Sequence, residues 1–341
     1  MKVLVTGHGG YIGAVLAPFL VRGGHEVTGL DTLFYGGCDL FEPEPVEALH
    51  ADVRDIRPDE LHGFDAVVHL AALSNDPLGD VDRDLTLAIN YRATVDLARA
   101  AKDAGIDRFV FASSCSMYGA AADGGGPVDE RAPLKPLTAY AESKVLAEEA
   151  LAELADEDFA PVSMRNATAY GASPRLRLDI VLNNLVGWAL TTGRVRILSD
   201  GTPWRPLVHV EDIARATLAF LEAPAEIVAG EAFNVGADAA NYQVRELAEI
   251  ARDAVGGCEI EYADAGDPDP RSYRVDFGKL RRTFPGLALT WTARAGADEL
   301  VSAYRRAGLT FDDFDGPRYT RLKRLRELSE KGALDGALRW R

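Results

Sequence analysis

The sequence is poor in the residues that would support disulfides or a metal centre. It has three cysteines, Cys38, Cys115 and Cys258, which are far apart and show no metal-ligand spacing with one another or with the six histidines. Neither a disulfide nor a bound metal is therefore expected, and the histidines are interpreted as structural. The sequence also lacks an apolar run long enough to span a bilayer, so no membrane partner is expected.

Positive charge is scarce as well. Lys and Arg number 37 against 53 Asp and Glu, which gives a formal net charge of −16. Such a chain would repel a phosphate backbone unless a basic face were segregated, so nucleic acid is not expected as a partner. The first residues, Met1–Thr6, lead directly into a strand pattern without a charged leader or cleavage site, and a cytoplasmic location is expected.

What is present is an alternation of strand-like and helix-like segments in an ordinary globular composition, 47% hydrophobic and 26% charged. Apolar runs predict strands at Lys2–Thr6, Glu26–Leu30, Ala66–Leu70, Arg108–Ala112 and Val162–Arg165. Segments rich in Ala and Leu predict helices near Tyr11–Arg22, Leu85–Ala104 and Ala139–Leu154. Alternation of this kind predicts an α/β protein with a doubly wound parallel sheet.

The pattern changes after residue 166. The length of 341 residues suggests about two lobes. Pro and Gly become frequent beyond residue 166, which predicts a smaller second lobe over 167–206 and 237–317. A regular pattern returns over 207–236, so this segment is expected to rejoin the first domain, 1–166, and to make the boundary discontinuous. The basic tail, 318–341, is predicted to form an amphipathic helix on the surface or against a neighbour.

A glycine-rich turn follows the first predicted strand. Gly7, Gly10 and Gly13 end the strand and open the first helix, where missing side chains let backbone amides approach a pyrophosphate at the positive helix end. The G-x-x-G-x-x-G spacing differs from the G-x-G-x-x-G fingerprint, so the context of strand before and helix after carries the prediction. The turn predicts a dinucleotide site.

Asp31 closes the second predicted strand, about twenty residues beyond the turn. A carboxylate there can accept hydrogen bonds from the adenosine ribose hydroxyls and would repel a 2′-phosphate, so NAD is favoured over NADP. Asp52 could hydrogen-bond the adenine amino group, although a surface aspartate is nearly as consistent with its position.

Tyr140 and Lys144 lie one turn apart on a predicted helix, after a serine cluster at Ser113–Ser116. A phenol and an ammonium at i and i+4 share one helix face, so the positive charge can lower the free energy of ionising the tyrosine. Such a tyrosine can act as a base near neutrality. Ser114 could donate a hydrogen bond to the alkoxide-like oxygen that forms when a secondary alcohol is oxidised.

These residues make the chain resemble extended short-chain dehydrogenases/reductases, in particular the NAD-dependent nucleotide-sugar epimerase and dehydratase family. The resemblance runs from Val3 to about Leu309. The matching motifs, in family order, are the glycine turn, His69–Ala72, Asn90 on a helix, Ser113–Gly119, Tyr140 with Lys144, Arg165–Gly171, Asn183-Asn184 and Arg205–Asp212. The resemblance implies a Rossmann-type NAD-binding domain, a substrate-binding second lobe, and a homodimer in which the helices near Leu85–Ala104 and Ala139–Leu154 pair across the interface.

The resemblance also implies individual roles. Tyr140 would be the catalytic acid/base, Lys144 would also hold the nicotinamide ribose, and Ser114 would bond the reacting sugar hydroxyl. The implied cofactor contacts are Gly7, Gly10, Tyr11, Ile12, Gly13, Asp31, Asp52, Val53, Leu70, Ala71, Ala72, Asn90, Tyr140 and Lys144. The implied contacts to a nucleotide-sugar substrate are Ser74, Asn75, Ser114, Asn166, Asn183, Asn184, Arg205 and Arg271.

Several reactions are compatible with this residue set. An epimerase that oxidises the sugar at C4 and returns hydride to the other face is the leading hypothesis. A reductase of a nucleotide-linked 4-keto sugar would use the same residues and consume reduced cofactor. Dehydratases of the family usually carry acidic residues where this chain has Cys115 and Ser116, so dehydration ranks third. Cys115, whose thiol could assist proton transfer if activated, and Ser116 are possible further catalytic residues. A non-catalytic nucleotide-binding protein is the remaining alternative.

Because of two departures from the family pattern, the sequence does not identify the sugar of the substrate. Pro206 follows Arg205 where family members often have Asp, with Trp204 before it, so the pocket wall can differ. In the loop after Leu73, Asn75 or Asp76 could touch sugar hydroxyls, and a capped turn ending at Pro77 explains them equally well.

Overall fold

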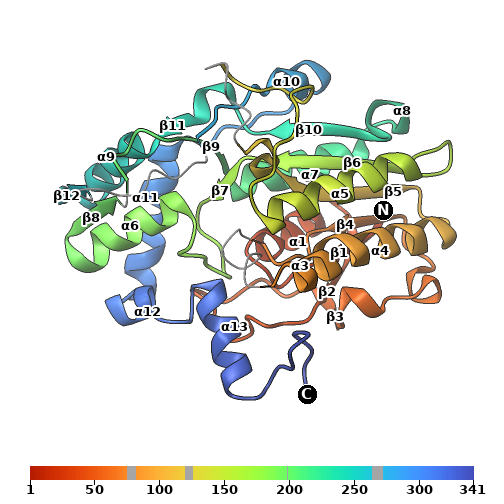
Figure 1. Ribbon diagram of the computed structural model, residues 1–341, viewed down its shortest axis with the longest axis horizontal. Coiled ribbons are helices and arrows are strands. Elements are labelled where there is room, and N and C mark those ends of the chain that lie inside the picture. The colour runs from red at the N-terminus through yellow and green to blue at the C-terminus, as the bar shows by residue number, and fades with distance from the viewer. Residues whose placement is uncertain (75–81, 120–125, 198, 263–271) are drawn as a thin grey trace.

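The computed structural model describes residues 1–74, 82–119, 126–197, 199–262 and 272–341. Its main feature is a seven-stranded parallel sheet in the order β10-β6-β5-β4-β1-β2-β3 (Figure 1). The register runs, for example, from Val3 of β1 to Val27 of β2 on one side and to Ala66 of β4 on the other. The predicted doubly wound parallel sheet is therefore confirmed.

The sequence-predicted elements are found with small shifts in their bounds. The strands are β1 (Lys2–Thr6), β2 (Glu26–Asp31), β3 (Glu47–His50), β4 (Ala66–His69), β5 (Arg108–Ser114), β6 (Ala160–Asn166), β7 (Thr168–Tyr170), β8 (Arg194–Ile197), β9 (Trp204–His209), β10 (Glu231–Val235), β11 (Asn241–Gln243) and β12 (Glu259–Tyr262). The helices are α1 (Gly13–Arg22), α3 (Arg83–Leu87), α4 (Ala93–Asp103), α5 (Ala139–Leu154), α6 (Val181–Thr192), α7 (Val210–Glu222), α8 (Ala225–Val228), α9 (Val244–Val255), α10 (Gly278–Thr283), α11 (Ala293–Ala307), α12 (Phe311–Asp315) and α13 (Arg321–Glu330).

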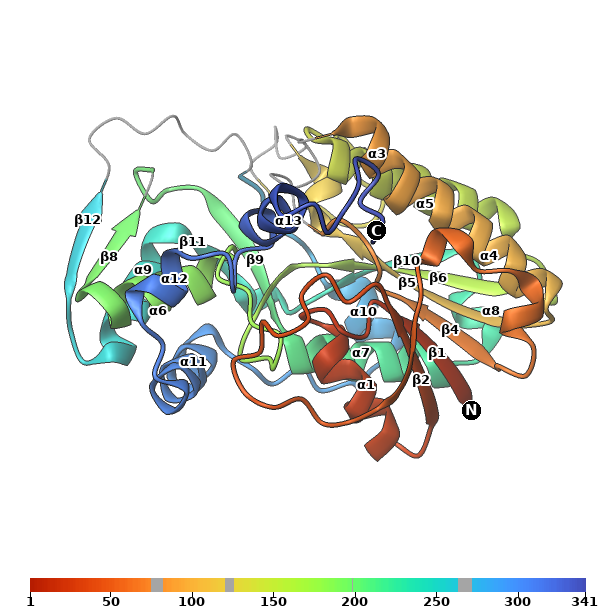
Figure 2. The ribbon, with the colours of Figure 1, turned by 90° about the horizontal axis from the view of Figure 1, so that it is seen from below.

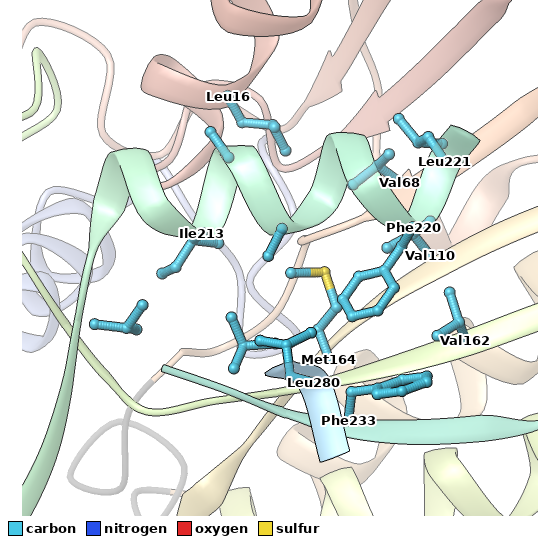
Figure 3. Close-up of a cluster of buried hydrophobic side chains, with 14 of the residues drawn as sticks. Leu16, Val68, Val110, Val162, Met164, Ile213, Phe220, Leu221, Phe233 and Leu280 are labelled. Carbon is cyan, nitrogen blue, oxygen red and sulfur yellow. The ribbon is translucent and has the colours of Figure 1, made fainter. Parts of the chain in front are cut away.

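Both faces of the large sheet are buried because side chains of a strand alternate between its faces. Val110 of β5 packs with α1 and α7, whereas its neighbours Phe109 and Phe111 pack with α4 and α5. Figure 3 shows the first of these layers, in which Phe220 of α7 lies over Met164 of β6. This explains why the central strands read as continuous apolar runs rather than alternating ones.

The second lobe has its own core and two small sheets, β11-β9-β7 and β12-β8. Helices α6, α9 and α11 pack around Leu182, Leu247 and Leu300, all fully buried. The chain enters this lobe after β6 and returns to the large sheet at β10, by way of α7. The residue boundaries of the two lobes stay a prediction.

Two expectations about helices need correction. The helix predicted over Leu85–Ala104 is three consecutive segments, because a π-helical turn at Ala88–Arg92 separates α3 from α4. The tail is helical only over α13; the chain then turns at Gly332, whose φ of +70° favours glycine, and Leu334 pairs with Trp340 in an antiparallel bridge. Figures 1 and 2 show α13 where the two lobes meet.

Within the described ranges, none of the helices combines the length and the apolar character that crossing a bilayer would require.

Candidate active site

A cavity of about 720 Å³ opens at the carboxyl ends of the parallel strands, between the two lobes. Nineteen of the residues predicted from the sequence line it: Gly7, Gly10, Tyr11, Ile12, Gly13, Asp31, Asp52, Val53, Leu70, Ala71, Ala72, Ser74, Ser114, Ser116, Tyr140, Lys144, Asn166, Asn184 and Arg205. The fold therefore brings residues from both lobes to one place. Asn75 and Arg271, like Asp76 and Pro77, lie outside the described residues.

The backbone of the glycine turn is packed so tightly against neighbouring backbone atoms that side chains at Gly7 and Gly13 would not fit. Gly7 has a φ of +74°, and a Cβ there would lie 2.7 Å from the backbone nitrogen of Ala71. A Cβ on Gly13 would lie 2.3 Å from the carbonyl oxygen of Gly7. The turn therefore exposes backbone amides at the start of α1, an arrangement that suits a pyrophosphate.

The two acidic residues at the adenosine end are already held by donors. Asp31 accepts hydrogen bonds from the backbone nitrogens of Gly9, at 3.1 Å, and Leu33, at 2.7 Å, which fix its carboxylate at the cavity wall. Asp52 accepts from Arg54 through both carboxylate oxygens. Burial alone would raise the pKa of Asp52, but the bonds from Arg54 hold it below its ordinary value.

Helix α5 places Tyr140 and Lys144 on the cavity side. It begins after Thr138, whose hydroxyl accepts from the backbone nitrogen of Ala141 at 3.1 Å. The Lys144 ammonium donates to the carbonyl of Ala112 at 2.7 Å and lies 4.5 Å from the centre of the Phe111 ring and 5.8 Å from that of Tyr140. Burial lowers the pKa of Lys144 to about 7, a shift that the Glu148 carboxylate partly offsets.

The three serines of the cluster, Ser113, Ser114 and Ser116, all line the cavity. Ser114 ends β5 and its hydroxyl accepts from the backbone nitrogen of Ser116 at 3.1 Å. The Ser116 Oγ and the Asn166 Oδ1 are buried at the cavity and have no hydrogen-bond partner among the described residues. Both residues line the cavity, so these two oxygen atoms lie next to the space that a ligand would occupy.

Cys115 does not line the cavity. Its thiol is 1% exposed, donates to the Arg165 carbonyl at 3.0 Å, and has a pKa raised by burial, so the thiolate is disfavoured. The candidate catalytic role of Cys115 is not supported by this placement. Burial next to the strand end gives it a packing role instead.

Two asparagines lie behind the cavity wall rather than in it. Asn90 is fully buried, and its side chain both accepts from the Leu73 backbone nitrogen at 2.8 Å and donates to the Leu73 carbonyl at 3.1 Å. Asn183 is fully buried too and accepts from the Gly171 backbone nitrogen at 3.1 Å. The predicted contacts of Asn90 with the cofactor and of Asn183 with the substrate therefore need correction. Both side chains instead support the backbone that lines the site. Asn184, the neighbour of Asn183, does line the cavity.

The buried histidines are structural in this arrangement. His69 contacts the hydroxyls of Thr6 and Thr94 through its two ring nitrogens, and burial lowers its pKa to about 3. His209 stacks on Trp291 with ring centres 3.8 Å apart. The described residues hold no cluster of three or more His, Cys, Asp or Glu that could bind a metal ion.

Sequence reasoning missed several lining residues, notably Tyr35, Arg177 and Arg321. Arg177 follows the Arg165–Gly171 motif, and a second arginine at 175 was a signal that could have drawn attention to it. Arg321 lies in the tail, far from every motif, so only the packing of α13 brings it to the cavity.

Comparison with known proteins finds one family and several relatives that this chain resembles. The profile described as "NAD dependent epimerase/dehydratase family" matches residues 3–236. A "UDP-glucose 4-epimerase" of Mycolicibacterium smegmatis is 31% identical, over 85% of this chain and 95% of its own. Similar solved structures include MoeE5 with UDP-glucuronic acid and NAD (29% identity, TM-score 0.77, 90% of this chain and 100% of that chain). Another is the dTDP-glucose 4,6-dehydratase DesIV of Streptomyces venezuelae (26%, 0.78, 92% and 100%).

Proposed function

Since this chain belongs to the NAD dependent epimerase/dehydratase family, we propose that it epimerises a nucleotide-activated sugar through a transient 4-keto intermediate. Family membership confirms the predicted family and an NAD-dependent enzyme. The observation that carries the proposal is that Tyr140, with Lys144 one turn away, lines the same cavity as the glycine turn.

The residues present fit a dinucleotide. The glycine turn offers amides without side chains, Asp31 stands at the position for the adenosine ribose, and Ala71 and Ala72 leave room along the channel. When NAD is bound, it supplies reversible hydride transfer at the sugar C4, without net consumption over the cycle.

The protein's own residues would transfer the proton of the C4 hydroxyl. Tyr140 would take the proton from the C4 hydroxyl and later return it, and Lys144 would favour the phenolate while its ammonium is charged. Ser114 would donate to the same oxygen. Ser116 and Asn166, whose side-chain oxygens lack partners among the described residues, would bind other sugar hydroxyls. Arg205 would bind the diphosphate, because a guanidinium can pair with two of its oxygens.

The acidic residues of the cavity favour epimerisation over dehydration. The carboxylates that line it, within the described ranges, belong to Asp31, Asp52 and Asp179. The first two are held as described above, and Asp179 accepts from Arg177 at 2.9 Å. Elimination of water needs an acid and a base beside the sugar, and Cys115 and Ser116 occupy those places in the sequence. The proposed substrate class is a nucleoside-diphosphate sugar, as in the relatives' names.

The test is incubation of the purified protein with NAD and a panel of nucleotide sugars and 4-keto sugars, followed by NMR of the products and absorbance of reduced nicotinamide. We expect a change of configuration at C4 with no net cofactor consumption. Stoichiometric loss of NADH or NADPH with a keto sugar would instead identify a reductase, and a 6-deoxy or unsaturated product a dehydratase.

Removing the Tyr140 hydroxyl should separate catalysis from binding. Tyr140→Phe is expected to lower kcat by about 10²- to 10⁴-fold, because the acid/base is lost while the ring remains. Tyr262→Phe, at an exposed position outside the cavity, is the matched control. A Tyr140→Phe protein with undiminished turnover would contradict the assignment.

A further inference from the structure

Three arginines gather above the glycine turn, and one of them comes from the tail. Arg175 donates through Nε to the carbonyl of Gly9 at 3.0 Å. Arg321, the first residue of α13, donates to the carbonyl of Arg175 at 3.1 Å and stacks on Tyr35 with 3.9 Å between the guanidinium carbon and the ring centre. Arg177 and Arg321 both line the cavity.

Arg321 is buried, and no described carboxylate is close enough to form an ion pair with it. It is 2% exposed, and its Nη1 has no hydrogen-bond partner among the residues that the structure describes. In the part of the chain that the structure describes, Arg175 pairs with Asp39 and Arg177 with Asp179, but no carboxylate pairs with Arg321. Burial lowers the pKa of Arg321 to about 10, so the guanidinium is still charged at neutral pH.

Arg177 also has an unsatisfied hydrogen-bond donor. It is 8% exposed, and its Nε and Nη1 donate to Asp179 and Ser74, but its Nη2 has no partner within the described ranges. A buried charged donor without a partner is costly, and an anion in the cavity would remove that cost. Planar guanidinium groups bind phosphate oxygens in particular.

We propose that Arg321 and Arg177 bind the pyrophosphate of the dinucleotide from the side opposite the glycine turn, so that the C-terminal segment is part of the cofactor site. The dinucleotide is favoured over the sugar nucleotide because the segment that carries Arg177 is bonded to the glycine turn itself. Besides the Arg175 contact, Ser173 donates to the carbonyl of Tyr11 at 2.8 Å.

The end of the tail contacts residues that line the predicted adenosine half of the same crevice. Arg54 donates to the carbonyl of Ala337 at 2.7 Å, and Trp340 donates to the carbonyl of Thr32 at 2.6 Å. Arg339 lies 3.6 Å from the Asp52 carboxylate. Thr32, Asp52 and Arg54 all line the cavity. The end of the tail is therefore attached to the wall of the cavity that carries the proposed site.

Binding of ADP-ribose and of adenosine to the full chain, measured by titration calorimetry, tests the contact without any turnover. Arg321→Gln is expected to weaken ADP-ribose binding by about 10-fold or more, since a hydrogen bond to a charged group is lost, and to leave adenosine binding unchanged. Arg321→Lys should lose less because the charge is kept. Arg326→Gln, at an exposed position of the same helix, is the matched control. Unchanged ADP-ribose affinity in Arg321→Gln would overturn the proposal, as would weakening seen only for UDP or dTDP added to the NAD-loaded protein.

A second measurement uses the unaltered protein and so does not depend on the variant folding. Trypsin cleavage after the exposed Lys331 is followed by mass spectrometry. ADP-ribose should slow cleavage several-fold more than adenosine, because the phosphates tie Arg321 and hence α13 to the cavity. Equal protection by the two ligands counts against the proposal. This inference deepens the proposed function, yet a protein that binds ADP-ribose in this way and epimerises no sugar would refute only that function.

Discussion

At the scale of single residues, the site depends on a lysine that burial has made a weak base. Lys144 is 2% exposed, and its ammonium is held by one carbonyl and two aromatic faces rather than by a direct carboxylate contact. The sequence predicted its nearness to Tyr140 from the i and i+4 spacing. It did not reveal the depth of burial, which depends on Phe111 and Ala112 of a strand far away in the sequence.

The lowered pKa of Lys144 makes stability depend on pH. The unfolded lysine keeps its proton up to about pH 10.4, whereas the folded one loses it near pH 7. Between these values the unfolded state binds more protons, so the unfolding free energy should rise with pH, by at most about 1.4 kcal/mol per unit from this residue. Below the folded pKa this dependence should vanish. Chemical denaturation of the wild type and Lys144→Met at several pH values measures it; parallel pH curves for the two proteins would contradict the prediction.

The buried thiol offers a test that separates packing from catalysis. Cys115→Ala should leave kcat within about threefold while lowering the unfolding free energy by about 1–2 kcal/mol, because a small cavity replaces the sulfur. Steady-state kinetics and urea denaturation provide the two values. A large fall in kcat with normal stability would restore Cys115 to the catalytic group.

At the scale of elements, strong patterns were predictable and weak ones were not. Helix α5 has the predicted bounds, because its Ala- and Leu-rich run begins at a threonine cap. Strand β3 was missed because all four of its residues are exposed, so the sequence shows no apolar run at this position. The π-helical turn at Ala88–Arg92 was also missed. Its Asn90 bonds the backbone of Leu73, and a helical sequence pattern gives no sign of a contact with another segment. The strand-end part of the cavity wall was predicted, because the glycine turn, Asp31, Leu70–Ala72 and Ser114 lie at the carboxyl ends of strands of one sheet; Tyr35, Arg177 and Arg321 lie outside these motifs and were missed.

The Asn90 contact should stabilise the loop after β4. Asn90→Leu removes both bonds to the Leu73 backbone and leaves buried groups unpaired, so the unfolding free energy should fall by about 2 kcal/mol and ADP-ribose binding should weaken. Denaturation and calorimetry check the two effects. Thr191→Val, which removes a helix-side hydroxyl bond in the second lobe, serves as a comparison and should leave binding intact. Unchanged stability in Asn90→Leu would show that the loop does not need this support.

At the scale of the whole molecule, a homodimer is the remaining expectation. Helix α5 presents Val145 and Leu146 half-buried at the surface, apolar residues that a partner copy could cover. We predict that light scattering after gel filtration gives a dimer for the wild type and a monomer for Leu146→Arg. Leu137→Arg, at an exposed apolar position outside α5, is the control and should remain dimeric. A dimeric Leu146→Arg protein would place the interface elsewhere.

The order of the strands has a consequence for synthesis on the ribosome. Strands β1 to β6 emerge first, but β10, which covers the edge of β6, follows only after β7, α6, β8, β9 and α7 have been translated. Until then β6 is paired on one side only, with β5, and the other edge of Val162–Asn166 is a template that another nascent chain can join. The yield of native protein in a cell should therefore depend on how quickly elongation carries Glu231–Val235 out of the exit tunnel.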